Sequence, residues 1–396
     1  MVVGGGLVGL TTALSLARSS LSITILEKKF PAYLQAAHSQ EDHHAIESRP
    51  LSLSHSSYQL LKTLNIWPSI EKFACPIQAV HVSHKGSFGK TRFSAEEEGL
   101  SALGYVVPFE RLHRTLYDSV LANPSITLQE IEEIHQVVCS SEGVEMTFLS
   151  QQKEEKYSAF LLAACDGVSS NLRQLLNIQV ESQDHQQTAL TGKINLKAEH
   201  SFTAYERFTE AGILAVLPSF TKKNCSFVWT MPQILAQDML ALSDQHFLEK
   251  FCEHFGYRLG KILSIERKKN YPLITTIANE QIRPSLVLLG NAAHTLYPIA
   301  AQGFNLALRD IDTLSQLITK AVESNLPINS EYLLKNYVES RKADQIAIKN
   351  LIQRIETVFG LPWPAIGPIK SASLLLIDFL SPLKHRLAKR ALGVIS

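Results

Sequence analysis

Short apolar runs, each followed at once by small residues, punctuate this chain of 396 residues. They occupy residues 1–3, 161–164 and 286–289. Uninterrupted apolar runs of this length predict strands of a parallel sheet that is buried on both faces. The first run is shorter than the ~5 residues of a usual strand. Either the natural start lies upstream, or the domain tolerates a short central strand.

Apolar residues at helical spacing alternate with these strands. Residues 10–17 carry an apolar face after a glycine cluster, and a second strand is expected at residues 23–26. Residues 111–120 and 302–310 again place their apolar side chains on one helical face. Strands that alternate with helices predict an α/β domain with a parallel sheet.

Between residues 178 and 271 the pattern changes to alternating, strand-like segments with one helix near residues 246–255. This texture predicts an antiparallel sheet, to which residues 76–93 contribute. The aromatic residues of this region could line a pocket or fill a core, and the sequence leaves both readings open: Phe202, Tyr205, Phe208, Phe227 and Trp229.

Composition narrows the function classes. A hydrophobic content of 45%, a charged content of 19% and a formal net charge of +1 fit a soluble globular chain and give no general nucleic-acid signal. The five cysteines lack CxxC spacing, which fits a reducing cytoplasm better than a disulfide framework or zinc. No apolar run approaches the ~18 residues that a membrane span needs. Without a basic segment at its start, the chain is not expected to carry a signal peptide.

A glycine cluster follows the first apolar run. Gly4, Gly6 and Gly9 have GxGxxG spacing, and Glu27 ends the second strand 27 − 9 = 18 residues later. Such glycines allow a tight turn and a close approach of the backbone to a pyrophosphate, while the acidic side chain accepts ribose hydroxyl protons. The pattern therefore predicts a dinucleotide site.

Two further loops have related chemistry. Asp166 and Gly167 follow the buried run at 161–164, with Arg173 seven residues beyond the aspartate. The run at 286–289 leads into the small residues 290–293 and then into a helix whose first turn carries Gly303. Unpaired backbone N–H groups at a helix N-terminus suit an electron-rich or anionic group.

The three motifs GGGLVG…Glu27, CDG…Arg173 and GNAAH…QGFN occur in one order and span nearly the whole chain. In that order they resemble the single-component aromatic hydroxylases that bind FAD, and most closely the ubiquinone-biosynthesis branch (2-polyprenyl-6-methoxyphenol hydroxylase type). The resemblance implies an FAD site formed by the following residues: Gly4, Gly6, Leu7, Val8, Gly9, Glu27, Lys28, Arg49, Arg111, Asp166, Gly167, Gly290, Asn291, Pro298, Gly303, Phe304 and Asn305.

Three positions depart from the family pattern. Asn291 stands where many relatives have Asp, and Ala301 where Gly is usual. Phe109 replaces a polar side chain that relatives often place against the flavin. His294 follows the small-residue loop and is expected to contact the site without acting as a base.

The resemblance implies an α/β fold with a Rossmann-like FAD-binding domain of the para-hydroxybenzoate hydroxylase type, an inserted β-sheet substrate domain and a helical C-terminus. The expected divisions are residues 1–75, 94–177 and 272–355 for the FAD-binding domain, 76–93 and 178–271 for the substrate domain, and 356–396 for the tail.

The implied activity is hydroxylation of the aromatic ring of a polyprenylated phenol in ubiquinone biosynthesis. NADPH or NADH would reduce FAD, and dioxygen would add to give a hydroperoxyflavin. No metal and no separate catalytic side chain are expected. Two alternatives stay open, a flavin-dependent reductase or dehydrogenase of the same fold and a non-catalytic subunit of a ubiquinone-biosynthesis complex.

A histidine-containing polar stretch and a basic amphipathic stretch lie outside these motifs. His38, His43 and His44 lie in a segment that reads as a solvated loop rather than as a metal site. Residues 382–392 form a basic amphipathic pattern that predicts packing onto the body, self-association, or contact with partners or a membrane surface. The expected location is the cytoplasm, with peripheral attachment at the inner face of the membrane left open.

Overall fold

The computed structural model describes residues 1–35, 49–86, 90–298, 302–360 and 393. The polar stretch 36–48, Ala301 and the amphipathic tail 382–392 lie outside these ranges.

Buried apolar runs build a parallel sheet, as their composition predicted. Its six strands lie in the order β18-β19-β12-β1-β2-β8, and only β18 runs antiparallel to its neighbour. The first strand is indeed a two-residue stub, yet it occupies a central position between β12 and β2. The strands are β1 (Val2–Val3), β2 (Ile23–Glu27), β8 (Ile126–Glu130), β12 (Leu162–Ala164), β18 (Ile282–Arg283) and β19 (Leu286–Leu288).

Alternate residues of these strands face two different cores. Val2, Ala163 and Val287 join the helical core, whereas Val3 and Leu288 join a core under a small antiparallel sheet. Burial on both faces explains why the strands read as continuous apolar runs. The helices are α1 (Leu7–Ala17), α5 (Phe109–Leu121), α6 (Asn171–Leu175), α9 (Gln302–Glu323) and α10 (Glu331–Gly360), and the small sheet contains β9 (Glu133–Cys139), β10 (Val144–Ser150) and β11 (Lys153–Ala159).

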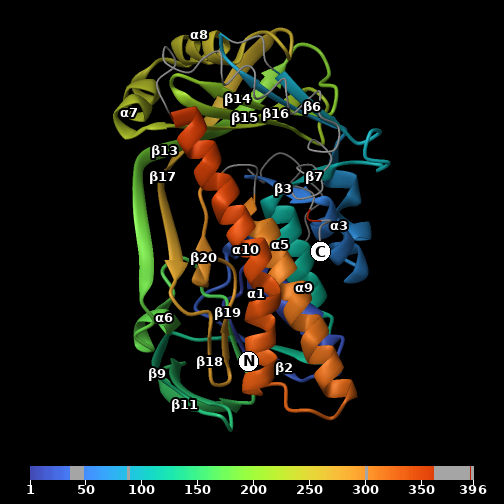
Figure 1. Ribbon diagram of the computed structural model, residues 1–396, viewed down its shortest axis with the longest axis vertical. Coiled ribbons are helices and arrows are strands. Elements are labelled where there is room, and N and C mark those ends of the chain that lie inside the picture. The colour runs from blue at the N-terminus through green and yellow to red at the C-terminus, as the bar shows by residue number, and fades with distance from the viewer. Residues whose placement is uncertain (36–48, 87–89, 299–301, 361–392, 394–396) are drawn as a thin grey trace.

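A second, eight-stranded sheet lies above the parallel sheet in Figure 1, and helices α7 (Gln233–Ala241) and α8 (Asp244–Phe255) cover its outer face. Its order is β20-β17-β13-β16-β15-β14-β5-β6, and the β5–β14 pair is parallel, which the antiparallel expectation missed. Its strands are β5 (Ala79–His84), β6 (Lys90–Ser94), β13 (Val180–Leu196), β14 (Thr203–Thr209), β15 (Gly212–Pro218), β16 (Asn224–Pro232), β17 (Ile262–Ala278) and β20 (His294–Thr295).

The expectation of one helix in this region is wrong, because α7 (Gln233–Ala241) precedes α8 (Asp244–Phe255). The buried residues of α7 are Ala236 and Met239, too few in two turns to give a clear helical period. Shorter elements complete the fold: α2 (Ala32–Gln35), β3 (Pro50–Ser54), α3 (His55–Thr63), α4 (Trp67–Ile70), η1 (Glu71–Phe73), β4 (Cys75–Ile77), β7 (Gly104–Pro108) and η2 (Gly290–Ala292).

The two faces of the eight-stranded sheet have different partners. On β16, Phe227 and Trp229 are fully buried in the core beneath α7 and α8. The intervening Val228 instead packs in the cluster that contains Tyr297 and Leu306, on the side of the parallel sheet. Phe227 and Trp229 are therefore core residues, and Trp229 also borders a cavity beneath the two helices.

Candidate cofactor site

Three sequence motifs meet at the carboxyl ends of neighbouring parallel strands. The Cys165 amide donates to the Val3 carbonyl at 2.7 Å, and the Leu289 amide donates to the Ala164 carbonyl at 2.9 Å. These bonds bring the loops after β1, β12 and β19 to one edge of the sheet. Ligands of open α/β sheets bind at this edge.

Glycine is required where these loops touch. At Gly4, whose φ is +110°, an added Cβ would lie 2.4 Å from the Cys165 carbonyl oxygen. At Gly290 an added Cβ would lie 2.8 Å from a methyl carbon of Val8. A side chain at either position would therefore push the second or third motif away from the first.

The N-terminus of α1 is open to a ligand. Gly6 is its N-cap, and a Cβ added there would meet no described atom within 4 Å. Leu7 is buried in the core and Val8 packs beside it, so both residues offer only their backbone N–H groups. The first turn carries no acidic residue. This arrangement fits a pyrophosphate, which an N-terminal helix turn attracts by its N–H groups and dipole.

Glu27 lies beside the same turn. Its carboxylate accepts hydrogen bonds from the Gly5 amide and, at 2.9 Å, from the Lys28 amide. The carboxylate thus reaches the glycine turn from the end of β2, where the ribose of a dinucleotide is expected. The Lys28 side chain is exposed.

The two carboxylate oxygens of Asp166 have different surroundings. Its Oδ2 accepts from the Leu172 amide at 3.0 Å, while its buried Oδ1 has no hydrogen-bond partner among the described residues. Gly167 has φ +85° and no described atom within 4 Å of an added Cβ. A buried carboxylate oxygen next to an open backbone fits a hydroxyl donor such as that of a ribityl chain.

Arg173 joins the second and third loops. Its guanidinium donates to the Ala292 carbonyl at 2.9 Å, to the Asn291 carbonyl at 3.3 Å and to the Val168 carbonyl. The residue is 7% exposed. It therefore acts as a clamp between loops, whereas the Asn291 side chain itself is exposed.

The third loop ends at α9. The Asn305 amide side chain accepts from the Ser54 amide at 2.8 Å and the Ser57 hydroxyl at 2.7 Å, and it donates to the Ser52 carbonyl at 3.0 Å. These bonds tie α9 to β3 and α3, so the Asn305 side chain is engaged by the protein itself. Gly303 again has no described atom within 4 Å of an added Cβ, and Phe304 is half-buried. Pro298 is exposed.

The two arginines predicted for the site stack on aromatic rings. The Arg49 guanidinium carbon lies 4.8 Å from the ring centre of Phe109, and the Phe109 amide donates to the Arg49 carbonyl at 3.0 Å. The unusual Phe109 therefore positions Arg49 instead of supplying a polar contact. Arg111 lies 4.5 Å from the ring centre of Phe73, so the structure directs it toward η1.

His113, which contacts the glycine turn, escaped the sequence analysis. His113, which is 4% exposed, lies with Nε2 2.9 Å from the Gly5 carbonyl oxygen and Nδ1 2.5 Å from the Tyr33 hydroxyl. Burial lowers the pKa of His113, and the Gly5 carbonyl opposes that shift. One turn earlier on α5, burial raises the pKa of Glu110, against the charge of Arg49. The sequence signal that could have identified His113 is its position two residues after the expected start of the helix at residue 111.

His294 belongs to a buried ionic cluster behind the third loop. Its Nε2 lies 3.4 Å from Asp310 Oδ2, and Arg341 Nε donates to Asp310 Oδ1 at 2.6 Å. Burial lowers the pKa of His294, and the Asp310 charge only partly opposes this. Asp344 bridges Arg341 to Arg309 of α9. The cluster fixes α10 to α9 and the loop.

Comparisons with known proteins agree with this geometry. A protein-family model described as "FAD binding domain" matches residues 1–349. The ubiquinone hydroxylase UbiL of Rhodospirillum rubrum is 26% identical over 395 residues, which cover 100% of this chain and 89% of that protein. The 3-demethoxyubiquinol 3-hydroxylase of Escherichia coli is 27% identical over 393 residues, which cover 99% of this chain and 98% of that protein.

Solved structures share the fold at low sequence identity. The p-nitrophenol 4-monooxygenase PnpA from Pseudomonas putida has a TM-score of 0.76 and 14% identity, with 100% of this chain and 98% of that chain covered. The anhydrotetracycline hydroxylase OxyS from Streptomyces rimosus has a TM-score of 0.72 and 16% identity, with 100% and 75% covered. These likenesses confirm the predicted α/β fold class.

Proposed function

The chain belongs to the FAD-binding-domain family of FAD-dependent monooxygenases, and we propose that it hydroxylates the aromatic ring of a polyprenylated phenol in ubiquinone biosynthesis. FAD is its cofactor, and NADPH or NADH is the proposed reductant. The relatives named as ubiquinone hydroxylases support this choice of substrate class.

The observation that carries the proposal is the convergence of three open backbone segments on one sheet edge. An added Cβ at Gly6, Gly167 or Gly303 would meet no described atom within 4 Å, so the backbone is open to a ligand at each. The buried Asp166 Oδ1 has no hydrogen-bond donor among the described residues. We propose that α1 holds the pyrophosphate, that Glu27 holds the ribose, and that Asp166 and the start of α9 hold the flavin end.

A second sheet supplies the proposed substrate face. Ile213 and Val228 are partly buried apolar residues that pack with Leu296 and Tyr297, next to Pro298. Because the loop carrying Pro298 also leads into α9, this face lies beside the proposed flavin end of the site. An electron-rich ring seated between Val228 and the loop would be shielded from water.

The protein's part in the reaction is positioning and exclusion of water. Bound FAD would accept electrons from the nicotinamide and transfer oxygen to the ring, and both steps are chemistry of the cofactor itself. The glycine turn and Asp166 orient the cofactor, and the apolar face of β15 and β16 orients the phenol. We assign no general base.

Within the ranges described, no helix is long and apolar enough to cross a membrane. We propose a cytoplasmic enzyme that reaches a prenylated substrate through residues 382–392, at the inner face of the membrane or within an assembly of ubiquinone-biosynthesis proteins or copies of itself. We also retain the predicted division into an FAD-binding domain, a substrate domain and a tail.

The test is turnover with labelled dioxygen. The purified yellow protein is supplied with NAD(P)H, ¹⁸O₂ and a short-chain prenylated phenol, and the product is analysed by mass spectrometry. One ¹⁸O atom in the ring hydroxyl supports the proposal. NAD(P)H oxidation that yields only hydrogen peroxide with every prenylated phenol tried would instead indicate a reductase. Accumulation of a quinone precursor in a deletion strain provides an independent check on the pathway.

A further inference from the structure

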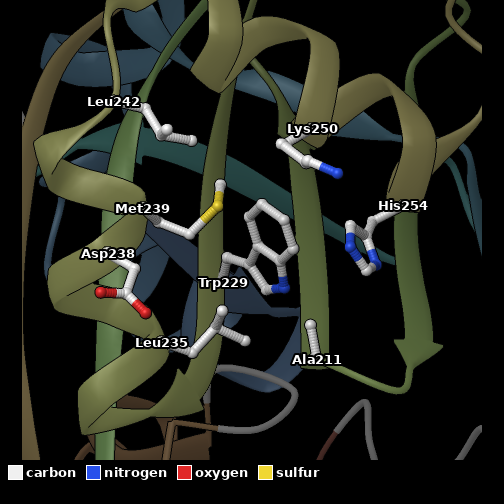
Figure 2. A pocket seen from close by; sticks show the side chains of 8 residues that line it. All are labelled: Ala211, Trp229, Leu235, Asp238, Met239, Leu242, Lys250 and His254. Carbon is white, nitrogen blue, oxygen red and sulfur yellow. The ribbon is translucent and has the colours of Figure 1, made fainter.

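A cavity of about 260 Å³ lies on the helix-covered face of the eight-stranded sheet. Figure 2 shows side chains from β16, α7 and α8 around it. This face is opposite to the proposed substrate face, because Trp229 belongs to the core under α7 and α8 whereas Val228 packs beside Tyr297. The cavity is lined by Trp229, Leu235, Met239, Leu242, Lys250 and His254, among others.

Two of the lining residues each carry a buried nitrogen atom that lacks a hydrogen-bond partner among the described residues. Trp229 is fully buried, and its Nε1 has no hydrogen-bond partner among the described residues. The buried Nδ1 of His254 has none there either. The two rings are neighbours, with centroids 5.2 Å apart (Figure 2). Buried polar atoms of native proteins are nearly always paired, so two beside one cavity point to a missing polar group.

The hydrogen-bonding roles of the two nitrogens indicate which polar group would pair with both. Burial lowers the pKa of His254, and Lys85 adds to the shift while Glu253 and Glu210 oppose it, which favours the neutral imidazole. A neutral imidazole has one acceptor nitrogen, while an indole N–H only donates. A single hydroxyl can accept from Trp229 and donate to His254.

The rest of the cavity suits a ring. Leu235, Met239 and Leu242 form apolar walls, and an apolar cavity of about 150 Å³ is enough to hold benzene. The lining also contains two charged residues, Asp238 and Lys250. Lys250 Nζ is paired with Glu253 Oε2 at 2.9 Å, so together with Asp238 it gives the rim no net positive charge. A neutral ligand is therefore favoured over an anion.

We propose that this cavity is a binding site for small neutral phenols, separate from the proposed substrate face. The phenol hydroxyl bridges Trp229 Nε1 and His254 Nδ1, and the ring packs against Leu235 and Met239. The site does not depend on the substrate proposed above. An occupant nevertheless lies one residue away from that face, because Val228 and Trp229 are consecutive on β16.

Calorimetric titration of phenol into the FAD-loaded protein without NAD(P)H tests the site. We expect saturable binding that His254→Phe and Trp229→Phe each weaken by about 3- to 10-fold, the effect of one lost hydrogen bond. Trp229→Phe keeps an aromatic ring in the core, so it serves if His254→Phe does not fold. Ala211→Leu places a larger side chain in the cavity wall and should abolish binding.

Val228→Phe is the matched control on the opposite face of the same strand. It should leave the affinity for phenol unchanged, which separates this site from the substrate face. Loss of binding in Val228→Phe with retention in Ala211→Leu would place the phenol at the substrate face and overturn the proposal. Absence of saturable binding up to about 10 mM phenol would also overturn the proposal and would indicate that water fills the cavity.

Discussion

Arg173 donates a hydrogen bond from its buried guanidinium to the carbonyl of Ala292 at 2.9 Å, across 119 residues of sequence. With its further bonds to Asn291 and Val168, it fixes the second loop of the site against the third. Besides the backbone pairing of β12 with β19, the spacing between the second and third loops therefore depends on a side chain that touches neither proposed end of FAD in our assignment.

Replacing this clamp should cost both stability and cofactor. Arg173→Met leaves the carbonyls of Val168 and Ala292 without their donor, and we expect a loss of about 2–3 kcal/mol in the free energy of unfolding. Urea denaturation and the FAD content after purification measure the two effects. Arg18→Met, at an exposed position, is the control. Unchanged FAD content in a folded Arg173→Met protein would show that loop spacing is not set by Arg173.

Two glycines of the first motif should respond differently to a side chain. Gly6→Val has room in the fold and an extended backbone, so the protein should fold but bind FAD at least about 100-fold more weakly, because the methyl groups occupy the pyrophosphate space. Gly9→Ala should fail to fold, since its Cβ would lie 1.8 Å from the Gly4 carbonyl oxygen. Circular dichroism and FAD titration separate the two outcomes. Full FAD occupancy in Gly6→Val would refute the assignment.

Asp166 is predicted to serve the cofactor as well as its own loop. Asp166→Ala removes the unpaired Oδ1 and the bond to Leu172, and we expect weaker FAD retention and slower flavin reduction by NAD(P)H. Ser170→Ala removes the cap of α6 without the carboxylate, and so controls for loss of the helix start. Equal FAD retention in both variants would reduce Asp166 to a structural residue. Stopped-flow absorbance gives the reduction rate.

The buried His294 should make the fold sensitive to acid. Because burial lowers its pKa, the unfolded chain binds a proton that the folded chain excludes. Its contribution to stability is complete above about pH 6.5 and is lost as the pH falls, by at most about 1.4 kcal/mol per pH unit. His294→Gln should flatten this slope in urea denaturation between pH 5 and 6.5, whereas His246→Gln, at an exposed site, should not. An identical slope in His294→Gln would contradict the prediction.

The amphipathic tail is predicted to govern surface association. Truncation after Pro382 should leave FAD bound but reduce sedimentation with anionic liposomes or break an oligomer. Each of the basic residues in the tail contributes about 1 kcal/mol near an anionic surface, falling with salt. Liposome binding at low and moderate salt, with analytical ultracentrifugation, checks this. A lower melting temperature with unchanged association would instead mean that the tail packs onto the body.

Local patterns predicted the cofactor edge because its chemistry depends on local residue types. Gly4 and Asp166 follow short buried strands, and strand ends of a parallel sheet meet at one edge. The family resemblance is confirmed by the FAD-binding-domain match to residues 1–349, while the role of each named site residue stays a prediction.

Long-range contacts set the features that sequence did not reveal. Asn305 accepts a hydrogen bond from the Ser54 amide across 251 residues, and no local sequence pattern predicts that pair. The stacking of Arg49 on Phe109 likewise depends on a tertiary contact between two segments that are separate in the sequence. Helix α7 was missed because its burial comes from the sheet beneath it rather than from a strong pattern of its own.

The alternation of β16 between two cores has a practical consequence for engineering. Variation at Ile213 and Val228 changes side chains that face Tyr297, while Trp229 and its neighbours under α7 and α8 keep the sheet assembled. Under the proposed function, a mutant library confined to the first set would test new ring substituents, and we expect little loss of expression. A library at the second set would mainly sample misfolded chains.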